Sequence, residues 1–276
     1  MEPLEPLESH VLFARNDAAG TFEVGTIDQI DGTYVSAQKG TGFGPGWTHV
    51  VAVGPHVLLV RNDDRHFEVG HIDQYDSQYA QTDSGTFSHD WTHVVAVGPH
   101  VLLVRNDAAG TFEVGHIDQS TARYVKTDGR TGFASDWTHV VAVGPHVLFV
   151  DDGGLYAVAH IDESNGRFVE TETGTFSVDW THVVAVCSRV FLSRADQFVV
   201  GHINHIGQFV KTQDPGPGVG GTPNPIHVVA VGPRVLGVSP TLALGFVMHF
   251  NHIGQFVETQ TGPDFASEWT HVVAVA

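Results

Sequence analysis

The sequence predicts an all-β fold: a six-bladed β-propeller of four-stranded antiparallel blades, formed by residues 1–276 as a single domain. The first observation is a repeat, because the 17-residue string WTHVVAVGPHVLLVRND occurs unchanged at 47–63 and at 91–107. The second is its spacing, since further units begin near 137, 180, 226 and 269. A period of about 45 residues in a strand-rich, glycine-punctuated chain is typical of a propeller or a solenoid array.

The unit that begins at Trp91 shows how one blade is expected to form. Two apolar stretches, 91–97 and 100–107, flank a Gly-Pro turn, and a third stretch follows at 111–118. A more polar fourth stretch, 123–127, precedes the loop to the next tryptophan. Four short strands separated by Gly, Pro, Asn and Asp form a meander. The first two are apolar on both faces, as expected for a sheet packed between neighbours. A right-handed parallel β-helix is the structural alternative.

The two ends of the sequence predict how the ring closes. The sequence enters its first unit at His10, which matches the second strand of a unit, and its last segment, 269–276, matches the first strand. Pairing of these two segments would complete the first blade. It would also remove two exposed sheet edges, which otherwise promote aggregation.

The charge of the chain narrows its possible partners. A formal net charge of −18 at pH 7 argues against nucleic acids and anionic membranes, which favour basic proteins. No apolar run approaches the ~20 residues of a membrane-spanning helix, and residues 1–10 do not resemble a signal peptide. Cys187 is the only cysteine, so we expect no intrachain disulfide. We expect a cytoplasmic protein, with non-classical release as an alternative, and the oligomeric state stays open.

The fifth and sixth units depart from the others. Segments 202–210 and 249–257 replace the GHID pattern, and a Gly/Pro-rich loop spans 214–225. Arg189 and Arg234 stand where earlier units have a histidine, namely His56, His100 and His146. We interpret this divergence as the result of an older duplication, and a special site in these two units is the alternative.

The strand order resembles a known group of propellers. The stretches VVAVGPHVLLV, VVAVGPHVLFV and VVAVGPRVLGV, followed by FEVGHID or LYAVAHID, are similar to the tectonin and tachylectin propellers and to the fucose-binding propeller lectins. This resemblance implies carbohydrate binding in pockets repeated around the ring. The third strand lacks the tryptophan-rich W-H-x-x-W pattern of the bacterial relatives, so the resemblance assigns no sugar-contacting residue here.

A four-residue motif at the entrance of each unit is the first candidate site. It combines a carboxylate, an indole, a hydroxyl and an imidazole, a set that suits the apolar face and the hydroxyl groups of a sugar. The predicted ligand-binding residues are Asp90, Trp91, His93, Asp136, Trp137, His139, Asp179, Trp180, His182, Glu268, Trp269 and His271. The structural alternative is that the tryptophan fills the space between blades while the carboxylate caps a turn.

A ring of first-strand histidines is the second candidate. It comprises His49, His93, His139, His182, His227 and His271. Imidazole is the commonest ligand for transition metals, so one axial site for Zn, Fe or Cu is the alternative to a protein without a cofactor. The simpler interpretation is a hydrogen bond to the Asn-Asp pair that ends the second strand, such as Asn106 and Asp107.

A third set combines histidine and aspartate on the third strand. The residues are His71, His116, His160, His202 and His249, with Asp28, Asp73, Asp118 and Asp162 nearby in the same strands. We interpret this set as structural, because no nucleophile motif, phosphate-binding loop or calcium loop accompanies it.

These observations favour a non-enzymatic, multivalent carbohydrate-binding protein, a lectin whose weak sites for glycans or small sugars gain avidity from repetition. A metal-binding protein or metalloenzyme and a protein-interaction scaffold are the alternatives.

Overall fold

The computed structural model describes residues 8–28, 31, 33–73, 75–134, 136–176, 180, 182–186, 189–194, 197–217, 227–231, 234–239, 244–250, 256–262 and 271–275. Within these residues the strands pair into six four-stranded antiparallel sheets, which we number in chain order. The sequence prediction of an all-β propeller with four-stranded antiparallel blades is confirmed. The parallel β-helix alternative is wrong, because every strand pair is antiparallel.

The strands of the first three sheets are as follows. Sheet 1 contains β1 (Glu8–Ala14), β2 (Phe22–Asp28), β3 (Tyr34–Gly40) and the C-terminal β24 (His271–Val275). Sheet 2 contains β4 (His49–Val53), β5 (His56–Arg61), β6 (His66–Ile72) and β7 (Tyr79–Thr86). Sheet 3 contains β8 (His93–Val97), β9 (His100–Arg105), β10 (Thr111–Asp118) and β11 (Arg123–Arg130).

The remaining three sheets follow the same order. Sheet 4 contains β12 (Trp137–Val143), β13 (His146–Asp151), β14 (Leu155–Asp162) and β15 (Arg167–Thr175). Sheet 5 contains β16 (His182–Val186), β17 (Arg189–Arg194), β18 (Gln197–Ile203) and β19 (Phe209–Pro217). Sheet 6 contains β20 (His227–Val231), β21 (Arg234–Ser239), β22 (Leu244–Phe250) and β23 (Phe256–Gly262). In sheet 6 Leu236 is the residue whose burial is described.

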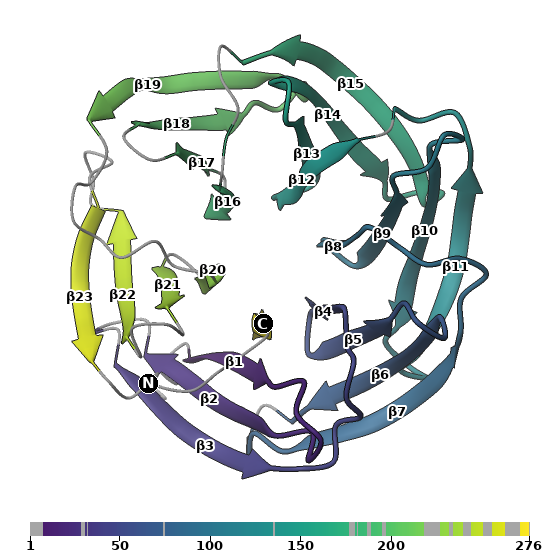
Figure 1. Ribbon diagram of the computed structural model, residues 1–276, viewed down its shortest axis with the longest axis vertical. Helices are drawn as coiled ribbons and strands as arrows, with labels where there is room; N and C mark the ends of the chain where they lie inside the picture. Colours follow the sequence, from purple (N-terminus) through teal and green to yellow (C-terminus); the bar gives the residue numbers. More distant parts are fainter. Residues whose placement is uncertain are drawn as a thin grey trace, which may run out of the picture.

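The sheets stand around a common axis. The innermost strands β4, β8, β12, β16, β20 and β24 each lie next to the following one, and β24 also lies next to β4 (Figure 1). Strand β24 pairs with β1, with His10 opposite Val275 and Ala14 opposite His271. The two ends of the chain therefore share one sheet, as the sequence predicted.

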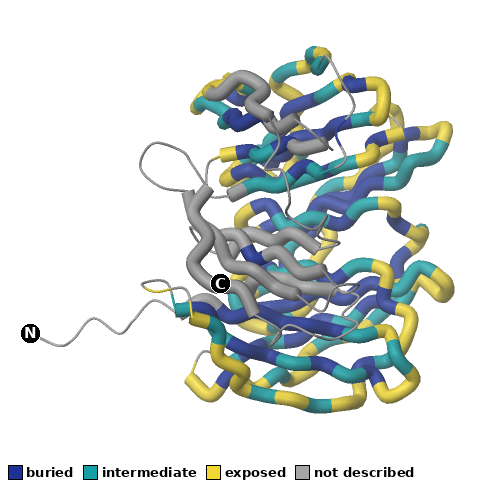
Figure 2. The backbone as a smooth tube through the Cα atoms, turned by 60° about the vertical axis from the view of Figure 1, so that its left-hand side comes forward, coloured by how far each residue is buried: buried dark blue, intermediate teal, exposed yellow. Residues whose placement is uncertain are grey.

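The core lies between neighbouring sheets rather than within any one of them. Val57 to Val60 of β5 are all 0 % exposed, which explains why the second strand of each unit is apolar on both faces. Within the sheets, the outermost strands carry most of the exposed positions, the second and third strands are largely buried, and the innermost strands are mostly half-buried (Figure 2). A unit of this size cannot bury such a core alone, so each sheet depends on its neighbours.

The fourth strands are longer than the sequence predicted. Strand β11 reaches Arg130 because a β-bulge between Val114 and Gly115 shifts its register, so that residues 128–130 still pair with β10. The same shift occurs at Val69 and Gly70 in sheet 2. The polar character of these residues suits an outer edge that faces solvent.

Candidate functional site

The tryptophans of the four-residue motif are buried. Trp91 is 1 % exposed and Trp137 is 2 % exposed, and both belong to the apolar clusters between sheets. Each is also held from the preceding sheet: the Trp91 amide donates to Asn62 Oδ1 (2.9 Å), and Asn62 Nδ2 donates to the Trp91 carbonyl (2.7 Å). An indole buried in this way offers no ring face to a ligand. The structure thus agrees with the packing alternative for these tryptophans.

The two described aspartates of the motif, Asp90 and Asp136, are exposed. Asp90 forms an ion pair with Arg105 at 3.2 Å, and Asp136 has a left-handed backbone with φ of 74°. Trp180 is 6 % exposed and packs in the same way as its counterparts. Asp179, Glu268 and Trp269, together with the side chain of His271, lie outside the described residues.

The first-strand histidines connect neighbouring sheets. His49 Nε2 donates to the Trp91 carbonyl (2.7 Å), His93 Nε2 to the Trp137 carbonyl (2.6 Å) and His139 Nε2 to the Trp180 carbonyl (2.8 Å). Since a carbonyl can only accept, Nε2 carries the proton in each ring. Burial lowers the pKa of His93 and of His139 and keeps both rings neutral.

The hydrogen bond predicted for these histidines has a different acceptor. His93 bonds to a carbonyl of the next sheet and not to Asn106 or Asp107, because the tryptophan backbone lies against the end of β8. Asn106 Nδ2 donates to the same Trp137 carbonyl at 2.7 Å. Among the described residues no group of three or more His, Cys, Asp or Glu side chains is placed to hold a metal ion. The side chains of His227 and His271 lie outside those residues, so an axial metal stays a prediction.

The opposite end of the sheets carries pairs of histidines. The second strand of a sheet begins with a histidine directly after the Gly-Pro turn, and it pairs with a histidine near the end of the third strand. The pairs are His56 with His71, His100 with His116, and His146 with His160. Their ring centroids are 5.2, 6.3 and 6.1 Å apart.

Each pair faces a turn of the following sheet, and we call this contact a junction. At the first junction, which has a single histidine, His10 Nε2 is 3.0 Å from Ser77 Oγ. At the second, His56 is hydrogen-bonded to the Gln119 side chain, and at the third, His100 interacts with the Glu163 charge. His10, His56 and His100 are all under 9 % exposed, so these three junctions are closed.

The fourth junction is open. A cavity of about 520 Å³ lies there between sheets 4 and 5, and His146 is only half-buried. The turn of sheet 5 places His205 at the position that Gln119 and Glu163 occupy in the preceding sheets. The lining residues are Pro145, His146, His160, Ile161, Asp162, Glu163, Thr171, His205 and Ile206.

Hydrogen bonds hold the turn that carries His205. Asn204 Oδ1 accepts from the amides of Ile206 (3.1 Å) and Gln208 (2.9 Å). Thr171 Oγ1 of sheet 4 donates to the Gly207 carbonyl at 2.8 Å, and this bond ties the turn to the wall of the cavity. Gly207 has φ of 78°, a conformation that favours glycine. The position of His205 therefore depends on the hydrogen bonds of its own turn and on Thr171 of sheet 4.

Burial and hydrogen bonds set the charge of two groups in the cavity, His146 and Asp162. Burial and the nearby His160 lower the pKa of His146, so this imidazole is neutral at pH 7. The Ser164 hydroxyl and amide, with Asn165, lower the pKa of Asp162, and their bonds to it are 2.6 to 2.9 Å long. Asp162 is thus an ionised carboxylate that is occupied by its own turn. The site can supply a neutral base and two further imidazoles next to carboxylates.

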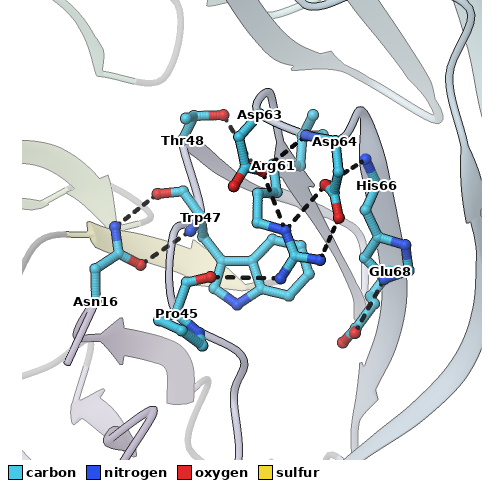
Figure 3. A network of polar contacts seen from close by, with 10 residues as sticks. Asn16, Pro45, Trp47, Thr48, Arg61, Asp63, Asp64, His66 and Glu68 are labelled. Atoms are coloured by element: carbon cyan, nitrogen blue, oxygen red, sulfur yellow. Dashed lines mark hydrogen bonds and ion pairs between the residues drawn. The ribbon is translucent and has the colours of Figure 1, made fainter. Parts of the chain in front are cut away.

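A second polar network lies at the other end of sheet 2 (Figure 3). The Arg61 guanidinium lies 5.3 Å from the centroid of the Trp47 ring and donates to both oxygens of Asp64, at 3.0 and 2.7 Å. His66 Nε2 is 3.3 Å from Glu68 Oε1. Among the described turns this one is a residue shorter than in sheets 1 and 3, and Arg65 has φ of 59° where they have Gly20 and Gly110. The Arg61 guanidinium covers the Trp47 ring, which is buried.

Comparisons with known proteins indicate the fold. No family model matches the chain, and no curated protein matches its sequence. A candidate 6-phosphogluconolactonase from Bacteroides uniformis is similar with a TM-score of 0.63, 14% identity, and coverage of 97% of this chain and 99% of that one. A candidate 6-phosphogluconolactonase from Bacteroides fragilis has a TM-score of 0.61 and 11% sequence identity, and the match covers 98% of each chain. The periplasmic gluconolactonase of Pseudomonas aeruginosa has a TM-score of 0.59 and 12% sequence identity, and the match covers 98% of this chain and 99% of that one. At these identities the likeness shows a β-propeller fold.

The lectin prediction is wrong. The similar structures reported above carry the names of sugar-lactone hydrolases, and no family model supports a tectonin or fucose-lectin relationship. The physical reason is the packing of the tryptophans, which the prediction needed on the surface. In the part of the chain that the structure describes, no helix has the length and apolar character needed to cross a bilayer. The cytoplasmic expectation stays a prediction, because one similar protein is periplasmic.

Sequence reasoning found part of the open junction. It singled out His160 and Asp162 as members of a repeated structural set, and it noted His146 as the start of a second strand. It missed His205, whose signal is the change from GHID to HINHIGQ in the fifth unit. The importance of that change depends on the turn of sheet 5 facing the wall of sheet 4, which no local pattern shows.

Proposed function

We propose that this chain hydrolyses small lactones derived from sugars, at the cavity of the fourth junction. The observation that carries the proposal is the opening of this junction. His146, His160 and His205 line one cavity there, while the histidines equivalent to His146 at three other junctions, His10, His56 and His100, are buried. The propeller fold is shared with proteins named as lactonases, which supports the substrate class by analogy.

The chemistry of lactone hydrolysis suits these side chains. Water attacks the carbonyl carbon, the carbonyl oxygen gains negative charge, and the ring C–O bond then breaks to give a hydroxy acid. Neutral His146 accepts the proton from the attacking water, because its lowered pKa keeps its lone pair free at pH 7. His160 and His205 donate hydrogen bonds to the developing oxyanion, and His146 passes the proton that it took from water to the leaving ring oxygen. Ile161, Ile206 and Pro145 supply apolar surface for the carbon skeleton.

Hydrolysis of glucono-1,5-lactone, measured above its uncatalysed rate, tests the proposal. We expect His146→Gln to lower kcat/KM by about 100-fold, the typical contribution of a positioned base. His100→Gln is the matched control, since His100 occupies the same place at a closed junction. No hydrolysis above background by the folded wild type, or an equal loss in both variants, would contradict the proposal.

We also propose that the six sheets are the six blades of one closed ring. Pairing of β24 with β1 and the continuous order of the innermost strands support this count. A closed ring matters for function because it holds sheets 4 and 5 at a constant distance, and the cavity lies between them.

A further inference from the structure

We infer that the cavity of the fourth junction selects an uncharged lactone and disfavours a phosphorylated one, with Glu163 as the specificity-determining residue. The inference rests on the proposed function for the lactone class, but its test measures binding and needs no turnover. The inferred selectivity for an uncharged lactone distinguishes this chain from the two similar proteins whose names specify a phosphorylated substrate.

The lining of the cavity is the first reason. None of the described residues that line it is a lysine or an arginine, and two are carboxylates, Asp162 and Glu163. Proteins bind phosphate groups mainly through arginine, lysine or the N-terminus of a helix. In the described part of the chain every regular element is a strand, so no helix supplies such a terminus.

The second reason is the sign of the local charge. Burial and the nearby His160 lower the pKa of His146, so this imidazole is neutral at pH 7 and does not offset the charge of the two carboxylates. A phosphate monoester carries a charge of about −1.5 to −2 at pH 7 and would be repelled. The hydroxyl groups of an uncharged sugar lactone can instead bond to both carboxylates and imidazoles.

Glu163 is the residue through which this selection acts. Asp162 is occupied by its hydrogen bonds to Ser164 and Asn165, and its replacement would disturb the turn. Glu163 is exposed, lines the cavity and also faces His100. The equivalent turn of sheet 3 has the neutral Gln119 at this position. Glu163→Gln therefore introduces a residue that a turn of this kind already accommodates.

Calorimetric binding of glucono-1,5-lactam and of its 6-phosphate tests the inference, since a lactam resists hydrolysis. We expect the wild type to bind the uncharged lactam at least tenfold more tightly. Glu163→Gln should lower the ratio of the two affinities, uncharged to phosphorylated, and Glu163→Lys should lower this ratio further or invert it. Raising the ionic strength should also narrow it, because salt screens repulsion between exposed charges. Glu170→Lys, which makes the same charge change on the exposed face of β15, should leave the ratio unchanged.

The outcomes separate this inference from the proposed function. Equal or tighter binding of the phosphorylated lactam by the wild type would overturn the inference, as would an equal effect of the substitutions at 163 and 170. Absence of binding of either lactam would overturn it as well. Selective binding of the uncharged lactam by a protein that hydrolyses no lactone would support the inference and overturn the proposed function.

Discussion

The Glu68 carboxylate is hydrogen-bonded to His66 rather than to the Tyr79 hydroxyl, which is buried without a partner in the described part of the chain. In two neighbouring sheets the equivalent bond is made: Tyr34 donates to Glu23 (2.8 Å) and Tyr124 donates to Glu113 (3.0 Å). A lysine stabilises each of those carboxylates, Lys39 in sheet 1 and Lys126 in sheet 3.

Sheet 2 differs because the lysines are missing from it. Ser84 and Gln81 occupy the register positions of Lys39 and Lys126, and His66 replaces the threonine that begins the third strand of sheet 3. Glu68 thus pairs with the nearest available side chain. Tyr79 keeps its place because its ring packs over Gly70, where a Cβ atom would collide with it.

This difference predicts opposite effects for one substitution at two sites. Tyr124→Phe should lower the free energy of unfolding by about 2 kcal/mol, because it removes a buried hydrogen bond to a charged group. Tyr79→Phe should leave it unchanged or raise it slightly, since the hydroxyl that it removes has no partner. Denaturant titration of both variants checks this. Equal destabilisation would show that Tyr79 has a partner.

The double variant His66→Thr with Tyr79→Phe extends the same argument. Without His66 the Glu68 carboxylate is free to accept from Tyr79, as Glu113 accepts from Tyr124. We therefore expect Tyr79→Phe to become destabilising by about 1 kcal/mol in the His66→Thr background. A double-mutant cycle measures this coupling, and additive effects would contradict it.

The buried histidines predict how stability depends on pH. Burial lowers the pKa of His56, His93, His100, His139 and His146 below the ordinary histidine value of about 6.5. For such groups the unfolded chain binds more protons than the folded one as pH falls below 6.5. The contribution of these histidines to the free energy of unfolding is therefore complete above pH 6.5 and is lost as the pH falls below it. Denaturant titrations from pH 8 to pH 5 should show falling stability, with a shallower slope in His93→Gln. Constant stability over this range would contradict the prediction.

Ring closure predicts the effect of a short truncation. Deletion of residues 271–276 removes β24 and leaves β1 with an unpaired edge. We expect loss of the folded monomer or aggregation, because each sheet depends on its neighbours and exposed edges associate. Size-exclusion chromatography with a thermal melt distinguishes the outcomes. A monomer with an unchanged Tm would show that closure contributes nothing to stability.

Local patterns were sufficient to predict the strands but not the site. The Gly-Pro turn, the apolar stretch from Val57 to Val60 and the repeat period together predicted four-stranded antiparallel sheets around an axis. The role of Trp91 depended on whether its ring faces a neighbouring sheet or solvent, and both choices fit the same sequence. The contact of His205 with the wall that carries His146 joins residues almost sixty positions apart, so it required the spatial order of the sheets.

Imidazole NMR spectra recorded with glucono-1,5-lactam test the central claim most directly. If the ligand occupies the fourth junction, the ring signals of His146, His160 and His205 should shift together on saturation. Those of His56 and His71, at a closed junction, should not change. Assignment by His146→Gln and His205→Gln removes one signal each. Shifts confined to histidines outside the fourth junction, or no shift at a lactam concentration that saturates the protein, would contradict the claim.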